Sequence, residues 1–237
     1  MSFLIIVSLG GVTFVVSYFV TRDIKINAME NNLAINSRTA SSAEASLRTT
    51  VAAADLFLEL AANGETNSEQ VENSESEEKL EASRAKFFER NTEIFAIYTE
   101  KTAFVNKSRQ QSREVRQNVI DAWQVYSKPS MAKAKSGSFV LENASPFFGF
   151  PLMAIFYAGR DSVVCVLFDT ETLGESFSGG SVNQSFLVNE NGDVLVHAEQ
   201  TKMLILTSEA ENPVFKEMQK KQPAKRADYL PGWRKNY

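Results

Sequence analysis

Residues 138–169 read SFVLENASPFFGFPLMAIFYAGRDSVVCVLFD, and this stretch decides the fold. It contains three runs rich in Val, Ile, Leu, Phe and Tyr, at residues 138–144, 151–158 and 162–169. Short apolar runs bounded by turn residues are typical of strands, and Gly159-Arg160-Asp161 supplies a turn between the last two. The stretch therefore predicts consecutive antiparallel strands, the last of them buried on both faces.

The flanking sequence adds two hairpins and several helices. We expect one hairpin within residues 93–107, turning at Thr99-Glu100-Lys101. A second is expected within residues 185–199, where Asn191-Gly192 is the pair favoured in tight hairpin turns. This order of elements has no βαβ repeat and predicts an α+β domain with an antiparallel sheet. The expected helices cover residues 78–90, 109–126 and 170–177, with Pro129 marking the end of the second.

The chain opens with an apolar stretch, FLIIVSLGGVTFVVSYFV at residues 3–20, that contains no charged residue. As a helix it would be about 27 Å long, enough to cross the hydrocarbon core of a bilayer. A cleaved signal peptide is the alternative, but no basic residue precedes the run and Tyr18 to Arg22 forms a poor cleavage site. We therefore expect a retained transmembrane anchor at residues 1–21 and a single-pass protein of the inner (cytoplasmic) membrane.

The charges beside this anchor bear on its orientation. Arg22 and Lys25 follow the span, and the positive-inside rule read alone would put the rest of the chain in the cytoplasm. A native start codon upstream of Met1, adding basic residues, would remove this conflict. On that hypothesis the bulk of the chain is periplasmic or extracellular.

A long amphipathic helix is predicted directly after the anchor, at residues 22–62. This segment contains no Pro or Gly, and its apolar residues recur at helical spacing. Asn63-Gly64 is a helix-ending signal. Residues 63–77 are rich in Glu, Ser and Asn, which predicts a solvated loop; a calcium site is disfavoured because the run has no Asp and no EF-hand spacing. A homodimer through the long helix is the protein partnership that we expect.

The composition argues against several function classes. A net charge of -4 and a pI near 5.3 supply no basic field, so we expect no nucleic-acid partner. The single cysteine, Cys165, rules out an intrachain disulfide and a thiolate metal cluster, and its apolar strand predicts an inert buried thiol. The single histidine, His197, has no nucleophile or acid partner at a telling spacing. We expect no catalytic residue, no metal ligand and no cofactor.

Several segments, taken in order, carry a family resemblance. They are the uncharged span, NSRTASSAEASL at residues 36–47, FFERNTEIFAIY at 87–98, the stretch from Asn143 to Phe177, and NQSFLVNENGDVLVH at 183–197. Together they resemble the double-Cache sensor region of bacterial transmembrane receptors, in particular that of receptor-type adenylate and guanylate cyclases.

The resemblance implies two stacked PAS-like modules outside the membrane, then a second span and a cytoplasmic output domain. Residues 78–178 would form the membrane-distal module, and residues 179–237 would hold part of the membrane-proximal module and an irregular tail. The likeness weakens after Glu199, and residues 222–237 offer neither the remaining strands nor a second apolar span. We expect a truncated or frameshifted reading frame, with a divergent but complete single-span protein as the alternative.

The candidate ligand site lies between residues 143 and 157, where aromatic and small polar residues alternate. Sensor pockets combine aromatic walls with a few polar groups that orient the ligand. The alternative is that these aromatic residues simply belong to the core of the sheet. The candidates are Asn143, Ser145, Phe147, Phe148 and Tyr157.

These observations favour a small-molecule sensing segment of a bacterial transmembrane receptor, without the output domain. In this reading a ligand changes the packing of the module against the long helix. A membrane-tethered binding or scaffold protein without signalling output is the main alternative. A membrane-tethered enzyme is a weaker one, because no constellation of acid, base and nucleophile is visible. No residue set selects among amino acids, organic acids and amines as ligands.

Overall fold

The computed structural model describes residues 2–68, 74–177 and 185–221. For residues 2–19, 63–68, 74–77, 79, 176 and 221 it describes the backbone only. The expected tail at 222–237 therefore lies outside the described residues.

The described chain is an α+β fold, as the sequence predicts. The helices are α1 (Ser2–Ser68), α2 (Ser74–Arg90), α3 (Lys107–Ser112), α4 (Gln117–Tyr126), α5 (Lys128–Lys135), α6 (Ser145–Phe148), α7 (Glu171–Phe177), α8 (Gln200–Leu204) and α9 (Pro213–Lys221). The strands are β1 (Ile94–Tyr98), β2 (Ala103–Val105), β3 (Val140–Asn143), β4 (Leu152–Ala158), β5 (Val163–Asp169), β6 (Phe186–Val188) and β7 (Val194–His197).

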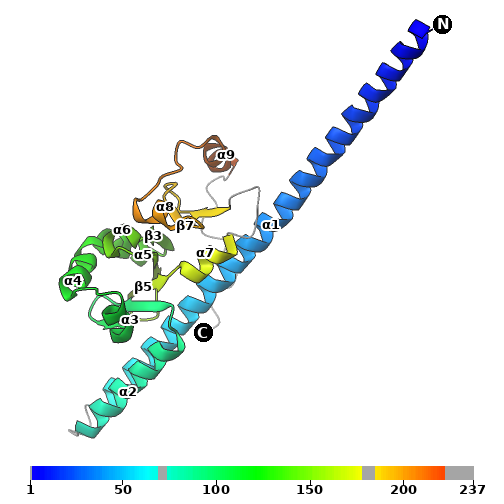
Figure 1. The fold of residues 1–237 in the computed structure, drawn as a ribbon. Coiled ribbons are helices and arrows are strands. Elements are labelled where there is room, and N and C mark those ends of the chain that lie inside the picture. Colours follow the sequence, from blue (N-terminus) through cyan, green and yellow to red (C-terminus); the bar gives the residue numbers. More distant parts are fainter. Residues whose placement is uncertain (1, 69–73, 178–184, 222–237) are drawn as a thin grey trace.

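The main sheet has five antiparallel strands in the order β2-β1-β5-β4-β3, with β5 at its centre (Figure 1). All residues of β5 are buried, which confirms the expected central strand. Successive side chains of a strand point to opposite faces. Val164, Val166 and Phe168 of β5 belong to one core, whereas Cys165 and Leu167 belong to the other. Both faces of the sheet are covered, which explains why the central strand is apolar from Val163 to Phe168.

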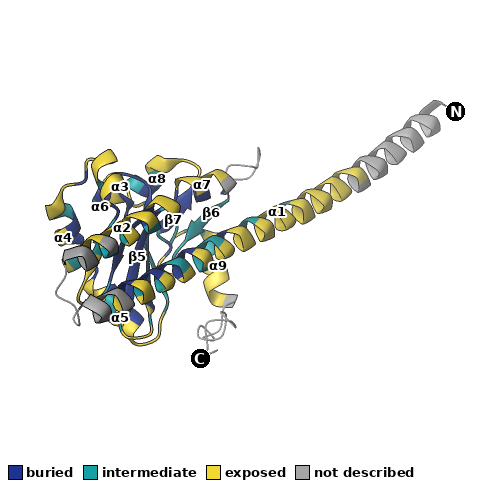
Figure 2. Ribbon diagram, turned by 90° about the horizontal axis from the view of Figure 1, so that it is seen from below, coloured by how far each residue is buried: buried dark blue, intermediate teal, exposed yellow. Residues whose placement is uncertain are grey.

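Helix α1 covers one face of the sheet, and helices α4, α5 and α6 lie against the other (Figure 1). The helical spacing of Ile35, Ala43, Leu47, Val51, Ala54 and Leu58 predicts a packed stripe on α1. Ala43, Val51 and Ala54 are buried as predicted, whereas Leu47 and Leu58 are half-buried and Ile35 is exposed; Phe57 and Ala61 extend the buried stripe. The described side chains of α1 before this stripe are mostly exposed, and Figure 2 shows this exposed segment projecting beyond the body. Among the described side chains, those that anchor the long helix to the sheet lie in its second half.

Helix α1 continues to Ser68, so the expected end at Asn63-Gly64 is wrong. A glycine inside a helix costs only about 1 kcal/mol, while each further residue adds a hydrogen bond to a helix that is already formed. Helix α2 starts at Ser74, earlier than predicted, and packs beside α1, where the Phe57 and Phe87 ring centroids lie 4.5 Å apart. The predicted acidic loop at 63–77 is therefore wrong for residues 63–68 and 74–77, which are helical, and residues 69–73 lie outside the described residues.

The prediction of a single helix at 109–126 is also wrong. The structure has two helices there, α3 and α4. Glu114 has a φ of 53°, in the left-handed region, and the Val115 N–H donates to the Gln110 carbonyl at 2.9 Å. Val115 is thereby turned into the core, where it is 9% exposed. Pro129 follows the end of α4, as expected, but it also lies in the first turn of a further helix, α5. The fixed φ and missing N–H of proline are tolerated at that position.

The predicted second hairpin forms from β6 and β7, with Gly192 at a φ of 86° in its turn. The other edge of this small sheet is partly covered, because the Val194 N–H donates to the Thr207 carbonyl and Asp193 bridges Ser208. The hairpin lies beside β3, the edge strand of the main sheet.

Among the residues whose side chains are described, no helix is long and apolar enough to cross a membrane. The expected span at residues 3–20 falls almost entirely on residues whose side chains are not described, although their backbone is helical.

Candidate ligand site at the edge of the main sheet

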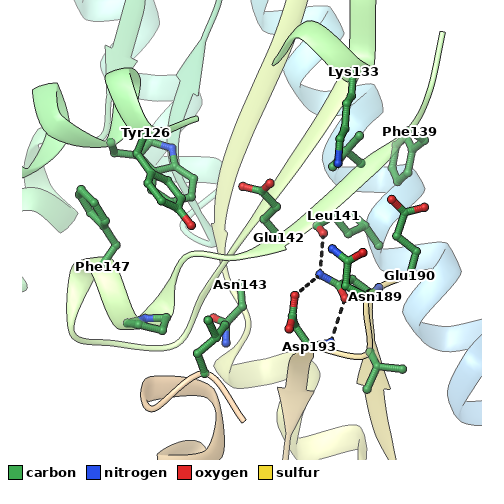
Figure 3. Close-up of a pocket in the computed structure, with 16 residues that line it drawn as sticks. Tyr126, Lys133, Phe139, Leu141, Glu142, Asn143, Phe147, Asn189, Glu190 and Asp193 are labelled. Atoms are coloured by element: carbon green, nitrogen blue, oxygen red, sulfur yellow. Dashed lines mark hydrogen bonds between the residues drawn. The ribbon is translucent and has the colours of Figure 1, made fainter. Parts of the chain in front are cut away.

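A cavity of about 500 Å³ lies where the second hairpin meets β3. This volume is within the range of about 300–1,000 Å³ that is typical of small-molecule sites. Strand β3 runs through its middle, helices α4, α5 and α6 supply one wall, and the β6–β7 turn supplies the other (Figure 3). The aromatic and charged residues that line it include Tyr126, Lys133, Glu142, Phe147, Glu190 and Asp193.

One end of the cavity is aromatic. The ring of Phe147 lies 5.5 Å from that of Trp123 and 5.6 Å from that of Tyr126, measured between centroids. Short helix α6 presents Phe147: Pro146 lies in its first turn, and Gly149 ends it at a φ of 81°. Tyr126 is 60% exposed, so the cluster continues from the core to the rim of the cavity.

Glu142 lies at the centre of the cavity, on β3, and is only half-buried (Figure 3). Its carboxylate accepts a hydrogen bond from the Ser130 hydroxyl of α5. Burial raises the pKa of Glu142; the Ser130 hydrogen bond and the charge of Lys133 oppose this rise, and Asp193 adds to it. Burial is the largest of these effects, so the site disfavours an unpaired charge on Glu142.

Two asparagines tie the hairpin to β3. The Asn143 amide donates to the carbonyls of Val194 at 2.9 Å and Met203 at 2.8 Å. The Asn189 amide donates to the Leu141 carbonyl of β3 at 3.5 Å and to the Asp193 carboxylate at 2.9 Å. The hairpin and β3 are therefore joined by specific polar contacts in both directions: Asn189 bonds a backbone carbonyl of β3, and Asn143 of β3 bonds a backbone carbonyl of β7.

The five residues predicted from sequence do not form one site. Asn143 and Phe147 line the cavity. Ser145 lies behind it, fully buried, and its hydroxyl bonds the backbone of Leu152. Phe148 is packed in the core among other aromatic rings. Tyr157 belongs to the opposite core and donates to Asp55 of α1 at 2.7 Å.

Sequence reasoning missed most of the polar wall of this cavity. Glu142 was visible as a charged residue inside an apolar strand, a usable signal of a site. Glu190 and Asp193 lie in a hairpin turn that was correctly predicted, but nothing local to the turn shows that it packs beside β3. Lys133 lies on α5, a helix that sequence reasoning did not expect.

The described residues offer little for catalysis. No group of three His, Cys, Asp or Glu side chains among them is arranged to hold a metal ion. His197 is buried; its Nδ1 accepts from the Glu199 N–H at 2.8 Å, and burial lowers its pKa. Cys165 is fully buried in β5, and burial raises the pKa of its thiol, which keeps it protonated. Both side chains are buried in the folded domain.

Comparison of the chain with protein-family models, with curated proteins and with solved structures finds no match. The fold and the cavity define the class: an α+β domain with a long helix on one face of its sheet and a small-molecule-sized cavity at the sheet edge.

Proposed function

We propose that this chain is the extracytoplasmic small-molecule-sensing segment of a membrane-anchored bacterial receptor. The observation that carries this proposal is the cavity of about 500 Å³ between β3 and the hairpin that follows the main sheet. A ligand there would touch two structural units at once. It would bind most tightly to one relative arrangement of them, which is what a sensor requires.

A route from the cavity to the long helix supports the proposal. Strand β3 pairs with β4, and the far end of β4 is linked to α1. Tyr157 of β4 donates to Asp55 of α1 at 2.7 Å, and Arg160 of the following turn lies 3.0 Å from Glu59 of α1. A shift of β3 on ligand binding would reach α1 through these contacts.

The membrane anchor is part of the proposal and has its own test. The uncharged residues 3–20 would hold the chain in the inner membrane, with the rest outside the cytoplasm. Reporter enzymes fused near Glu75 should be active when they require the periplasm and inactive when they require the cytoplasm. The reverse pattern would contradict the orientation.

Sensing is tested on the full-length, solubilised chain with a library of amino acids, organic acids and amines. We expect at least one compound to raise the melting temperature and to change hydrogen exchange in residues 43–61 of α1. Val188→Trp, which fills the cavity, should abolish both effects. Val125→Trp, on an exposed position that is 63% accessible, should abolish neither.

The outcome also separates the sensor from a binding or scaffold protein. If exchange changes only around the cavity and not in α1, the chain binds a ligand without transmitting the event. If no compound acts through the cavity, the sensing proposal is wrong.

A further inference from the structure

The charges around the cavity are unbalanced. Of the charged side chains that the structure places along its wall, Glu142, Glu190 and Asp193 are carboxylates and Lys133 alone is cationic. They come from different elements: Glu142 from β3, Lys133 from α5, and the other two from the β6–β7 turn. The excess of negative charge therefore lies on β3, in the middle of the cavity, and on the hairpin wall (Figure 3).

The aromatic wall favours the same sign of ligand charge. Faces of aromatic rings carry negative potential and attract cations, with the strongest effect at sites shielded from water. Tyr126 and Phe147 form the aromatic end of the cavity, and Figure 3 shows them across from the turn that carries Asp193. A ligand held between these walls meets aromatic side chains on one side and carboxylates on the other.

From these observations we propose that the cavity binds a small organic cation, an amine or a quaternary ammonium compound, with its charged group beside Glu142 and its apolar body against Tyr126 and Phe147. This inference rests on the proposed function and names the ligand class of the same site. An organic cation fits better than a metal ion, because aromatic rings replace hydration water around a diffuse organic charge but supply no oxygen ligands to a hard ion.

The position of Glu142 explains how such a ligand would be detected. This carboxylate is partly removed from water, which disfavours its charged form. A cation beside it would stabilise that charged form in place of the missing water. Asp193 and Glu190 approach from the hairpin, so the same cation would draw the turn toward β3. Binding and closure of the two units would then be one event.

Calorimetry on the full-length, solubilised chain tests the proposal with choline, putrescine and phenethylamine. Neutral partners of the first two, 3,3-dimethyl-1-butanol and 1,4-butanediol, report the contribution of charge. We expect at least one cation to bind, and its neutral partner, where there is one, to bind at least tenfold more weakly. Glu142→Gln should weaken the cation at least tenfold, while Glu30→Gln, on the exposed part of α1, should leave it unchanged.

Tyr126→Leu provides a second variant in case Glu142→Gln disturbs the fold, because Tyr126 is largely exposed. It should weaken the same cation several-fold through loss of the ring face. Failure of all three cations to bind, or equal binding to the Glu142→Gln variant, overturns the inference.

Two further arms separate this inference from the proposed function. If succinate binds and Val188→Trp abolishes its binding, the cavity is a sensor site for anions: the cation class is wrong and the sensing proposal stands. If Ca²⁺ competes with the organic cation in a manner that depends on Glu142, the site is a metal site and the inference is again overturned.

Discussion

Glu142 sets a pH dependence of stability that can be measured directly. Burial raises its pKa in the folded state, so the folded protein holds this proton more tightly than the unfolded chain does. Its contribution to stability is therefore complete below the unfolded value and is lost as the pH rises through the folded value. We expect Glu142→Gln to match the parent protein near pH 4 and to melt at a higher temperature near pH 7. A variant that melts lower than the parent at pH 7 would show that the charged form is stabilised in the fold.

Val164 tests the burial of the central strand. It is 1% exposed and packs in the core between the sheet and α1. A carboxylate at this position would lose its water without gaining a partner, so Val164→Asp should cost more than about 4 kcal/mol and leave the domain unfolded. Val125→Asp, at an exposed position, should change the free energy of unfolding by less than about 0.5 kcal/mol. Circular dichroism and urea titration measure both, and a folded Val164→Asp protein would contradict the assignment of β5.

At the scale of elements, an apolar stripe of helix α1 packs against the body, beside the polar contacts of Asp55 and Glu59. Phe57 is 2% exposed and its ring meets those of Phe87 and Phe104, with centroids 4.5 Å and 5.0 Å away. Phe57→Ala should destabilise the protein by about 3–5 kcal/mol, because it leaves a cavity between α1, α2 and β2. The neighbouring Leu56 is 56% exposed, so Leu56→Ala should cost less than about 0.5 kcal/mol. Equal costs in urea titrations would mean that the helix does not pack as described.

At the scale of the whole molecule, Asn143 is one of the contacts that attach the second hairpin to the main sheet, beside Asn189 and the apolar core. Asn143→Ala removes the donor to the Val194 and Met203 carbonyls, and an unpaired buried polar group costs about 1–3 kcal/mol. We expect faster hydrogen exchange in residues 194–209, while β4 and β5 keep their protection. Asn191→Ala, in the exposed turn, is the matched control. Uniformly faster exchange throughout the domain would show that the hairpin and the sheet unfold as one unit.

The amino-acid sequence alone determined the strands of the main sheet, the two hairpins and the α+β class. These features depend on local patterns: apolar runs of strand length, turn residues between them, and the Asn191-Gly192 pair. Because each pattern involves neighbours in the chain, no knowledge of the fold was needed to interpret it. The same holds for Ala43, Val51 and Ala54 of the buried stripe of α1, whose spacing follows the helical period, but not for Phe57.

Only the tertiary structure decided where the helices break and where the cavity lies. The break at Glu114 forms because Val115 turns into the core, and the end of α1 reflects helix propagation rather than a local stop signal. The cavity joins Tyr126, Glu142 and Asp193, which come from separate elements and meet only because the hairpin packs on the edge of β3. Tyr157, close to Glu142 in sequence, lies on the other face of the sheet, because neighbouring strands place their side chains by register and not by distance along the chain.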